Sequence, residues 1–181
     1  LMWEKICIDY AVSQKDNGVK DFFMKQLQII GGDATVQSLK SFLNDKDMCN
    51  PALAAIIKSG SKAVESILAE SLKNKDLPCP AAVMNALAGM KSQLAVNEYI
   101  AWSSSVDVNT KASALNALAR SGNPLALPVL LKAAKDVFYR WEVSGATAAL
   151  LNYADNAGQN GDIKTMDRIC LLVISKCKDK L

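Results

Sequence analysis

Histidine is absent from all 181 residues of the chain. It is the commonest general base and the commonest metal ligand, so its absence excludes Ser-His and Cys-His catalytic arrangements and the histidine-containing zinc and di-iron sites of some helical repeats. The Gly-x-x-x-x-Gly-Lys and Gly-x-Gly-x-x-Gly motifs that cradle nucleotide phosphates are missing too. We therefore expect no catalytic residue, no cofactor and no metal, and hence no enzyme activity in this segment.

Long apolar runs and an excess of one charge are also missing. No stretch reaches the ~20 apolar residues of a membrane span. The 21 basic and 18 acidic residues leave a net charge of +3, which is too balanced to require a nucleic acid or an anionic membrane. We expect neither partner, and we interpret the basic cluster of Lys176, Lys178 and Lys180 as a solvated tail.

The Cys-x-x-Cys pair is missing as well, since none of the five cysteines forms one. Cys170 and Cys177 lie on one expected helix about 10 Å apart, too far for a disulfide. The odd count favours free thiols. We expect no signal peptide. The abrupt start at "LMWEK" leaves the location open: cytoplasmic, or periplasmic or secreted if the segment was cut from a longer precursor.

An internal repeat is the strongest positive signal. The stretch "NALA" occurs at 85–88 and again at 116–119. Four aspartates keep nearly the same phase along the chain, and each closes a helix-like stretch: Asp47, Asp76, Asp107 and Asp136. A repeat period of about 30 residues is typical of stacked helical repeats.

Each unit is expected to form two helices. In "NPALAAIIKSG", Asn50 is expected to cap a helix that enters through Pro51 and stops at Gly60. A second helix is expected over 61–76, because its apolar residues follow helical spacing. Asn123-Pro124 repeats the entry signal for the second helix of a later unit.

We therefore predict an all-α fold and a single domain over 1–181. A capping helix over 1–16 precedes four repeats, and a longer capping repeat over 137–181 follows them. Within that last repeat we expect a helix over 137–155, a loop over 156–162 and a final helix. The boundaries of the four repeats are 17–47, 48–76, 77–107 and 108–136.

One segment, "RSGNPLALPVLLKAAKD" (120–136), resembles the short bacterial HEAT repeat of the phycobilisome-lyase type. The 17–136 region resembles it most clearly, although Met90 to Gln93 replace the Gly-Asn-Pro corner in one unit. The resemblance implies an armadillo/HEAT-like, right-handed α-α superhelix of about five helix-turn-helix repeats whose second helices line a concave surface. Such arrays mostly bind proteins or act as spacers, and the family pattern contains no catalytic residue.

Two groups of residues are candidates for partner binding. Trp102 is expected on the surface, with Glu98 and Lys132 on the second helices nearby, whereas Tyr99 falls on a core position. Trp102 is either a binding anchor or, as we favour, a side chain that packs on the next repeat. Likewise, the aromatic cluster Phe138, Tyr139 and Trp141 either forms a patch for a partner or, as we favour, seals the change in repeat geometry.

The function that we expect is a non-catalytic protein-protein interaction or scaffold module, whose partner is another protein or an adjacent domain of the same chain. Its abrupt ends suggest a segment of a larger bacterial protein, for instance a secreted sugar-processing one. The alternative is a HEAT-like nucleic-acid binder or a DNA-alkylation-repair-type glycosylase using Trp102, Lys132, Lys135 and Trp141. Glutamates on the second helices make that groove mixed rather than basic, which argues against it. A non-repeating helical bundle is the third possibility.

Overall fold

The computed structural model describes residues 2–177. These residues are 72% helical and contain no strand, which confirms the all-α prediction. Eleven α-helices and one 3-10 helix follow one another along this part of the chain: α1 (Met2–Ser13), α2 (Asn17–Ile30), α3 (Asp33–Leu39), η1 (Lys40–Asn44), α4 (Cys49–Lys58), α5 (Val64–Ser71), α6 (Pro80–Gly89), α7 (Val96–Trp102), α8 (Val108–Ser121), α9 (Ala126–Asp136), α10 (Ala146–Gln159) and α11 (Ile163–Lys176).

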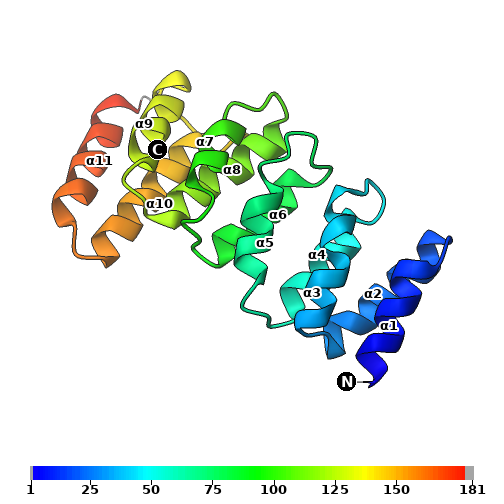
Figure 1. Cartoon of the computed structure of the whole chain (residues 1–181). Helices are drawn as coiled ribbons and strands as arrows, with labels where there is room; N and C mark the ends of the chain where they lie inside the picture. The colour runs from blue at the N-terminus through cyan, green and yellow to red at the C-terminus, as the bar shows by residue number, and fades with distance from the viewer. Residues whose placement is uncertain (1, 178–181) are drawn as a thin grey trace. The chain divides into compact units, whose positions relative to one another are not determined.

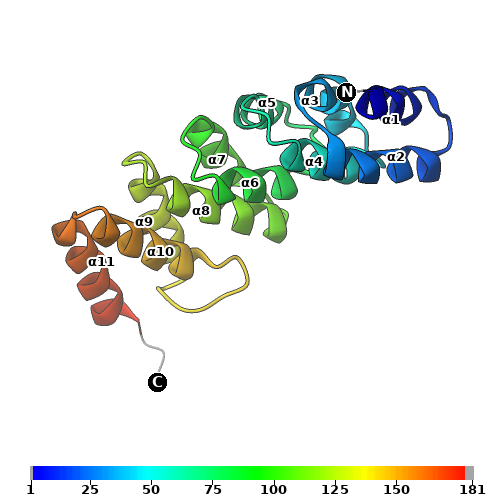
Figure 2. The same cartoon turned by 90° about the horizontal axis from the view of Figure 1, so that it is seen from below.

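The helices group into two compact units, one ending at Val83 and the other beginning at Met84, within α6. In the first unit, α2 packs against α1 and α4, and α3 packs against α1 and α4. In the second unit, α8 packs against α7, α9 and α10, and α10 also packs against α9 and α11. Helices α10 and α11 lie side by side as an antiparallel pair (Figure 1 and Figure 2).

A left-handed residue ends the first helix of three successive helix pairs. Gly60, Lys91 and Gly122 have φ angles of 68°, 54° and 63°, and they are evenly spaced along the chain. The predicted helix stops at Gly60 and before Asn123 are therefore confirmed. The same turn forms at Lys91, where no glycine is present, even though the left-handed conformation costs an L-residue about 1–2 kcal/mol.

The residue directly after each left-handed position has a side-chain oxygen, so these oxygens follow the same period. Each oxygen accepts a hydrogen bond from the backbone N–H two residues further on, at 2.9–3.2 Å. These short side chains form the turns that lead into the second helices. The acceptors are Ser61, Ser92 and Asn123, and the donors are the amides of Ala63, Leu94 and Leu125.

Small buried residues line the first helices, as their alanine content predicts. Five alanines of α4 and α8 are at most 1% exposed, which lets the backbones of neighbouring helices approach closely. Larger apolar side chains fill the space that remains. These five alanines are Ala52, Ala55, Ala114, Ala117 and Ala119.

The aspartates of the repeat do not all close helices. Asp47 and Asp76 lie in the turns that precede α4 and α6, and Asp107 caps α8 by accepting a hydrogen bond from the Thr110 amide at 2.7 Å. Only Asp136 is the last residue of a helix. The prediction that each closes a helix is wrong for Asp47, Asp76 and Asp107; at Asp107 the reason is that a carboxylate also satisfies the free N–H groups at a helix start.

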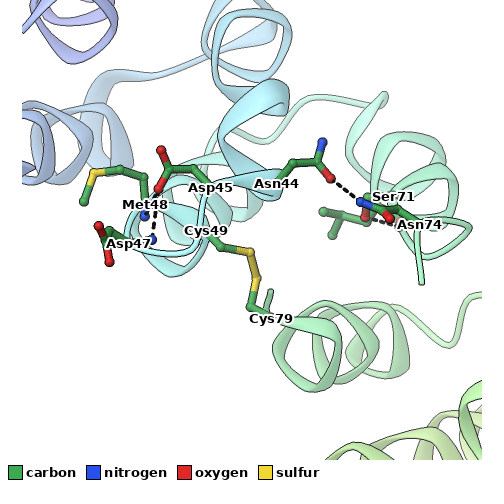
Figure 3. The surroundings of a disulfide bond; sticks show 9 residues. Asn44, Asp45, Asp47, Met48, Cys49, Ser71, Asn74 and Cys79 are labelled. Atoms are coloured by element: carbon green, nitrogen blue, oxygen red, sulfur yellow. Dashed lines mark hydrogen bonds between the residues drawn. A yellow bond between two sulfur atoms is a disulfide. The ribbon is translucent and has the colours of Figure 1, made fainter. Parts of the chain in front are cut away.

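Hydrogen bonds join side chains about one repeat apart. The amide of Asn74 donates to the Asn44 side chain at 2.8 Å in the first unit (Figure 3). In the second unit, the Asn123 amide donates to Gln93 at 3.4 Å. Both pairs are separated by 30 residues, so the interactions follow the period seen in the sequence.

A disulfide joins Cys49 and Cys79, whose Cα atoms lie 6.2 Å apart (Figure 3). The expectation of free thiols is therefore wrong for this pair. It holds for Cys7, Cys170 and Cys177, which are free. An odd count cannot reveal which cysteines the fold brings together.

Several helix limits differ from those predicted. Helix α4 begins at Cys49 with Met48 as its N-cap, so Asn50 lies inside the helix and does not cap it. Helix α5 covers only Val64–Ser71 of the expected helix over 61–76, because turns occupy both ends of that range. Alternative hydrogen bonds in short turns compete with helix ends, which is why end positions are hard to predict.

The largest difference lies after α9. The helix expected over 137–155 does not exist as one element, since residues 137–145 form a loop and α10 begins at Ala146. The loop expected over 156–162 is correspondingly short, because α10 continues to Gln159. The last helix begins as predicted, at Ile163, and ends at Lys176.

Candidate functional site

The loop over 137–145 begins with an unusual helix stop. The Phe138 amide donates to the Lys135 carbonyl at 2.9 Å, and the Tyr139 amide donates to the Ala134 carbonyl at 2.8 Å, which is the Schellman pattern. Phe138 and Tyr139 have φ angles of 57° and 58°. Glycine usually occupies the first of these positions, as Gly161 does after α10 with a φ of 87°. Two bulky residues here indicate a strained backbone that the surrounding structure maintains.

The other end of the loop is fixed by Glu142. Its carboxylate accepts hydrogen bonds from the Ser144 and Ala146 amides, both at 2.7 Å, and from the Ser144 hydroxyl at 2.8 Å. Burial opposes ionisation of Glu142, but these hydrogen bonds outweigh it and lower its pKa. The Thr147 hydroxyl also donates to the Arg140 carbonyl at 2.8 Å. The loop is therefore tied to the first turn of α10.

Between these anchors, apolar side chains point to solvent. Phe138 is 72% exposed, Trp141 is 82% exposed and Val143 is 74% exposed, whereas Tyr139 is half-buried. The interpretation that the aromatic cluster seals the junction is therefore wrong for Phe138 and Trp141. A group of large apolar side chains exposed on an anchored loop is typical of an interaction surface.

A hollow of about 590 Å³ lies beside this loop in the second unit. Phe138 and Tyr139 line it, so the structure brings these two predicted candidates together. Three cationic side chains complete the lining, from α9, the loop and α11: Lys135, Arg140 and Lys176. We call these five residues the aromatic-basic hollow. None of the three cations is among the partner-binding candidates that the sequence indicates, since Lys135 enters only the nucleic-acid alternative and Lys176 only the solvated tail.

The other predicted candidates lie elsewhere. Tyr99 is fully buried, as expected, but Trp102 and Glu98 are both half-buried, so Trp102 is not the open surface residue that its position in the repeat predicted. Lys132 is exposed and lines a separate hollow of about 430 Å³ with Lys111. Neither Trp102 nor Glu98 lines that hollow.

A third hollow, of about 280 Å³, is polar and lies between α8 and α10. The Arg120 guanidinium, through Nε, donates to the Ala88 carbonyl at 2.9 Å. The Asn156 amide reaches the Ala119 and Arg120 carbonyls, each at 3.3 Å. These side chains satisfy carbonyls at the ends of α6 and α8, which is a structural role.

Within residues 2–177, no group of three or more metal-ligating side chains comes together. None of the helices described has both the length and the apolar character needed to cross a membrane. No protein-family model and no curated protein matches this sequence. The class that the fold defines is an all-α protein whose helices pack against their neighbours.

Proposed function

We propose that this chain is a non-catalytic protein-protein interaction or scaffold module, built as a right-handed α-α superhelix of HEAT-like repeats. The regular repeat supports the architecture, because the left-handed helix stops and the turn-forming side chains both follow it. Units of this kind bury their apolar faces by stacking, which leaves a long surface for partners.

The observation that carries the interaction role is the loop over 137–145. Its backbone is anchored at both ends, yet Phe138 and Trp141 are 72% and 82% exposed. The hydrogen bonds that anchor the loop backbone thus hold large apolar side chains in solvent. Such exposure is unfavourable unless a partner covers the side chains. A protein partner, or an adjacent domain of the same chain, provides such a cover.

The disulfide between Cys49 and Cys79 supports a periplasmic or secreted location, since disulfides persist mainly in oxidising compartments. That location agrees with the sequence-based suggestion of a secreted multidomain protein. Thiol labelling of protein expressed in its native host tests the location: a cytoplasmic, reduced pool of the two cysteines would contradict it.

The interaction role is tested by photo-crosslinking in native extracts, with a crosslinking residue at Val143. The wild type is compared with Phe138→Gly and Trp141→Ala. Lys91→Gly is the matched control, because Lys91 and Phe138 occupy the same position of a Schellman turn. A genuine partner is captured by the wild type and the control and is lost in both loop variants. Equal capture by all four proteins would contradict the proposal.

A further inference from the structure

The aromatic-basic hollow has the chemistry of a peptide site. We infer that it binds an acidic peptide segment of a partner protein, in which an apolar side chain lies next to carboxylates. This inference rests on the proposed function and names the chemistry of the partner. It is carried by the charge, the apolar surface and the rigidity of the hollow.

Among the residues described, the charged side chains that line the hollow are all cations. Lys135, Arg140 and Lys176 line it, and no carboxylate among the described residues does. Lys135 and Lys176 form no ion pair with any residue that the structure describes. The nearby acid Glu142 already accepts three hydrogen bonds at the start of α10. The two lysines are therefore available to form charge-assisted hydrogen bonds with carboxylates of a ligand.

The hollow has room for an apolar side chain together with its neighbours in a peptide. Phe138 and Tyr139 line it, and a volume of about 590 Å³ is within the range of small ligand pockets. Aromatic residues and arginine are the types that most often dominate binding energy at interfaces. The hollow therefore suits an apolar anchor residue flanked by acids.

Rigidity favours binding of a flexible segment. The Schellman turn fixes the backbone at Phe138 and Tyr139, and Thr147 holds the Arg140 carbonyl at 2.8 Å. A site whose backbone is already ordered loses less conformational entropy when it binds. The strained φ angles at the two aromatic residues agree with this, since such strain is concentrated at ligand-binding positions.

A peptide fits this hollow better than a nucleic acid. Tight binding to phosphates uses many cations along the backbone, of the order of 6–10 contacts for a typical DNA-binding protein. The hollow supplies three cations gathered around two aromatic residues. This arrangement matches a short acidic motif, and an oligonucleotide therefore serves as a competing ligand in the test.

The test measures fluorescence anisotropy of labelled 12-residue peptide pools with the wild-type chain. In the first pool, Asp and Glu flank Leu or Phe. In matched pools, Asn and Gln, or Lys, replace the acids, and labelled oligo-dT is a fourth probe. We expect binding of the acidic pool, at least about fivefold weaker binding by Lys135→Glu and Lys176→Glu, and at least about tenfold weaker binding by Phe138→Gly.

Two control variants make the same charge change and the same backbone change at positions outside the hollow. Lys164→Glu makes the same charge change at the opposite end of α11, about 18 Å from Lys176 along the helix, and is expected to bind as the wild type does. Lys91→Gly controls for relief of backbone strain. Circular dichroism melts establish that each variant is folded before its affinity is compared.

The remaining outcomes overturn the inference. Equal binding of the acidic and neutral pools would show that the cations are not used, and tighter binding of oligo-dT would assign the hollow to nucleic acid. No peptide binding at millimolar concentration would also overturn it. If crosslinking still captured a partner that depends on Phe138, the proposed interaction role would stand and only the acidic chemistry would be wrong.

Discussion

Cys49 and Cys79 are joined by a disulfide although 30 residues separate them in the chain. Cys49 is the first residue of α4, and Cys79 directly precedes α6. The bond thus links the starts of two helices one repeat apart. The cross-link closes a loop in the chain and thereby lowers the conformational entropy of the unfolded state.

Removing this disulfide is expected to destabilise the protein by about 3–4 kcal/mol, as the loop length predicts. The measurement is urea unfolding of the wild type and of a Cys49→Ala/Cys79→Ala double variant, each with and without reductant. Reductant is expected to lower the stability of the wild type only. If it lowered both equally, or neither, the bond would contribute nothing through this mechanism.

Glu4 is expected to stabilise the contact between α1 and α3. Its carboxylate accepts hydrogen bonds from the Gly32 amide at 2.7 Å, the Thr35 amide at 3.2 Å and the Thr35 hydroxyl at 2.9 Å. Glu4→Ala leaves these buried donors without acceptors, so we expect a loss of about 1–3 kcal/mol. Thr35→Val removes only one donor and is expected to cost less, as urea unfolding would show.

The same carboxylate makes stability depend on pH. Burial raises the pKa of Glu4, but the hydrogen bonds from Gly32 and Thr35 outweigh it, and the pKa lies below its ordinary value. A lowered pKa adds stability above the ordinary pKa of glutamate, and this contribution is lost as the pH falls through the folded-state pKa. Glu4→Gln is therefore expected to flatten the acid side of the stability curve, and an unchanged slope would contradict this account.

Phe138→Gly is expected to leave the protein as stable as the wild type or to stabilise it by about 1 kcal/mol. The φ angle of 57° favours glycine, and a ring that is 72% exposed contributes little burial. Lys91→Gly, at a φ of 54°, should behave alike. Thermal unfolding followed by circular dichroism checks both. A clear loss of stability in Phe138→Gly alone would show that the ring supports the fold.

Glu142→Ala is expected to loosen the start of α10. It removes the acceptor for the Ser144 and Ala146 amides, a change comparable with loss of a helix cap, at about 1 kcal/mol. Hydrogen exchange should become faster at these amides and stay unchanged in α8. Uniformly unchanged exchange would mean that the loop is held without Glu142.

The contrast between two helix ends shows how far a sequence can be interpreted locally. The corner after Ser121 was predicted because Gly122, Asn123 and Pro124 each favour a turn for a local reason. The stop at Phe138 was missed, since "VFYRWEV" contains no glycine or proline and its apolar residues fit a helix. Lys91 shows the same point, because its turn conformation also contradicts its residue type.

The candidate site was predicted only in part. The scarcity of aromatics makes Phe138, Tyr139 and Trp141 candidates, but their sequence pattern favours a buried role. Their exposure depends on where the backbone turns, and Lys135 and Lys176 join them because α9 and α11 end beside the same loop. These two lysines lie on different helices, and α10 lies between those helices in the chain. No short stretch of the sequence indicates that the two lysines are close together.

The sequence by itself determined the all-α class, the spacing of about 30 residues between its helix stops and the lack of histidine. These properties follow from the composition and from the spacing of apolar residues, and such signals can be recognised within short stretches of the sequence. Only the tertiary structure decided the pairing of Cys49 with Cys79, the capping of α3 by Glu4 and the break after α9. Each of these depends on groups that meet only after the helices have packed, because hydrogen bonds and disulfides act over a few ångströms.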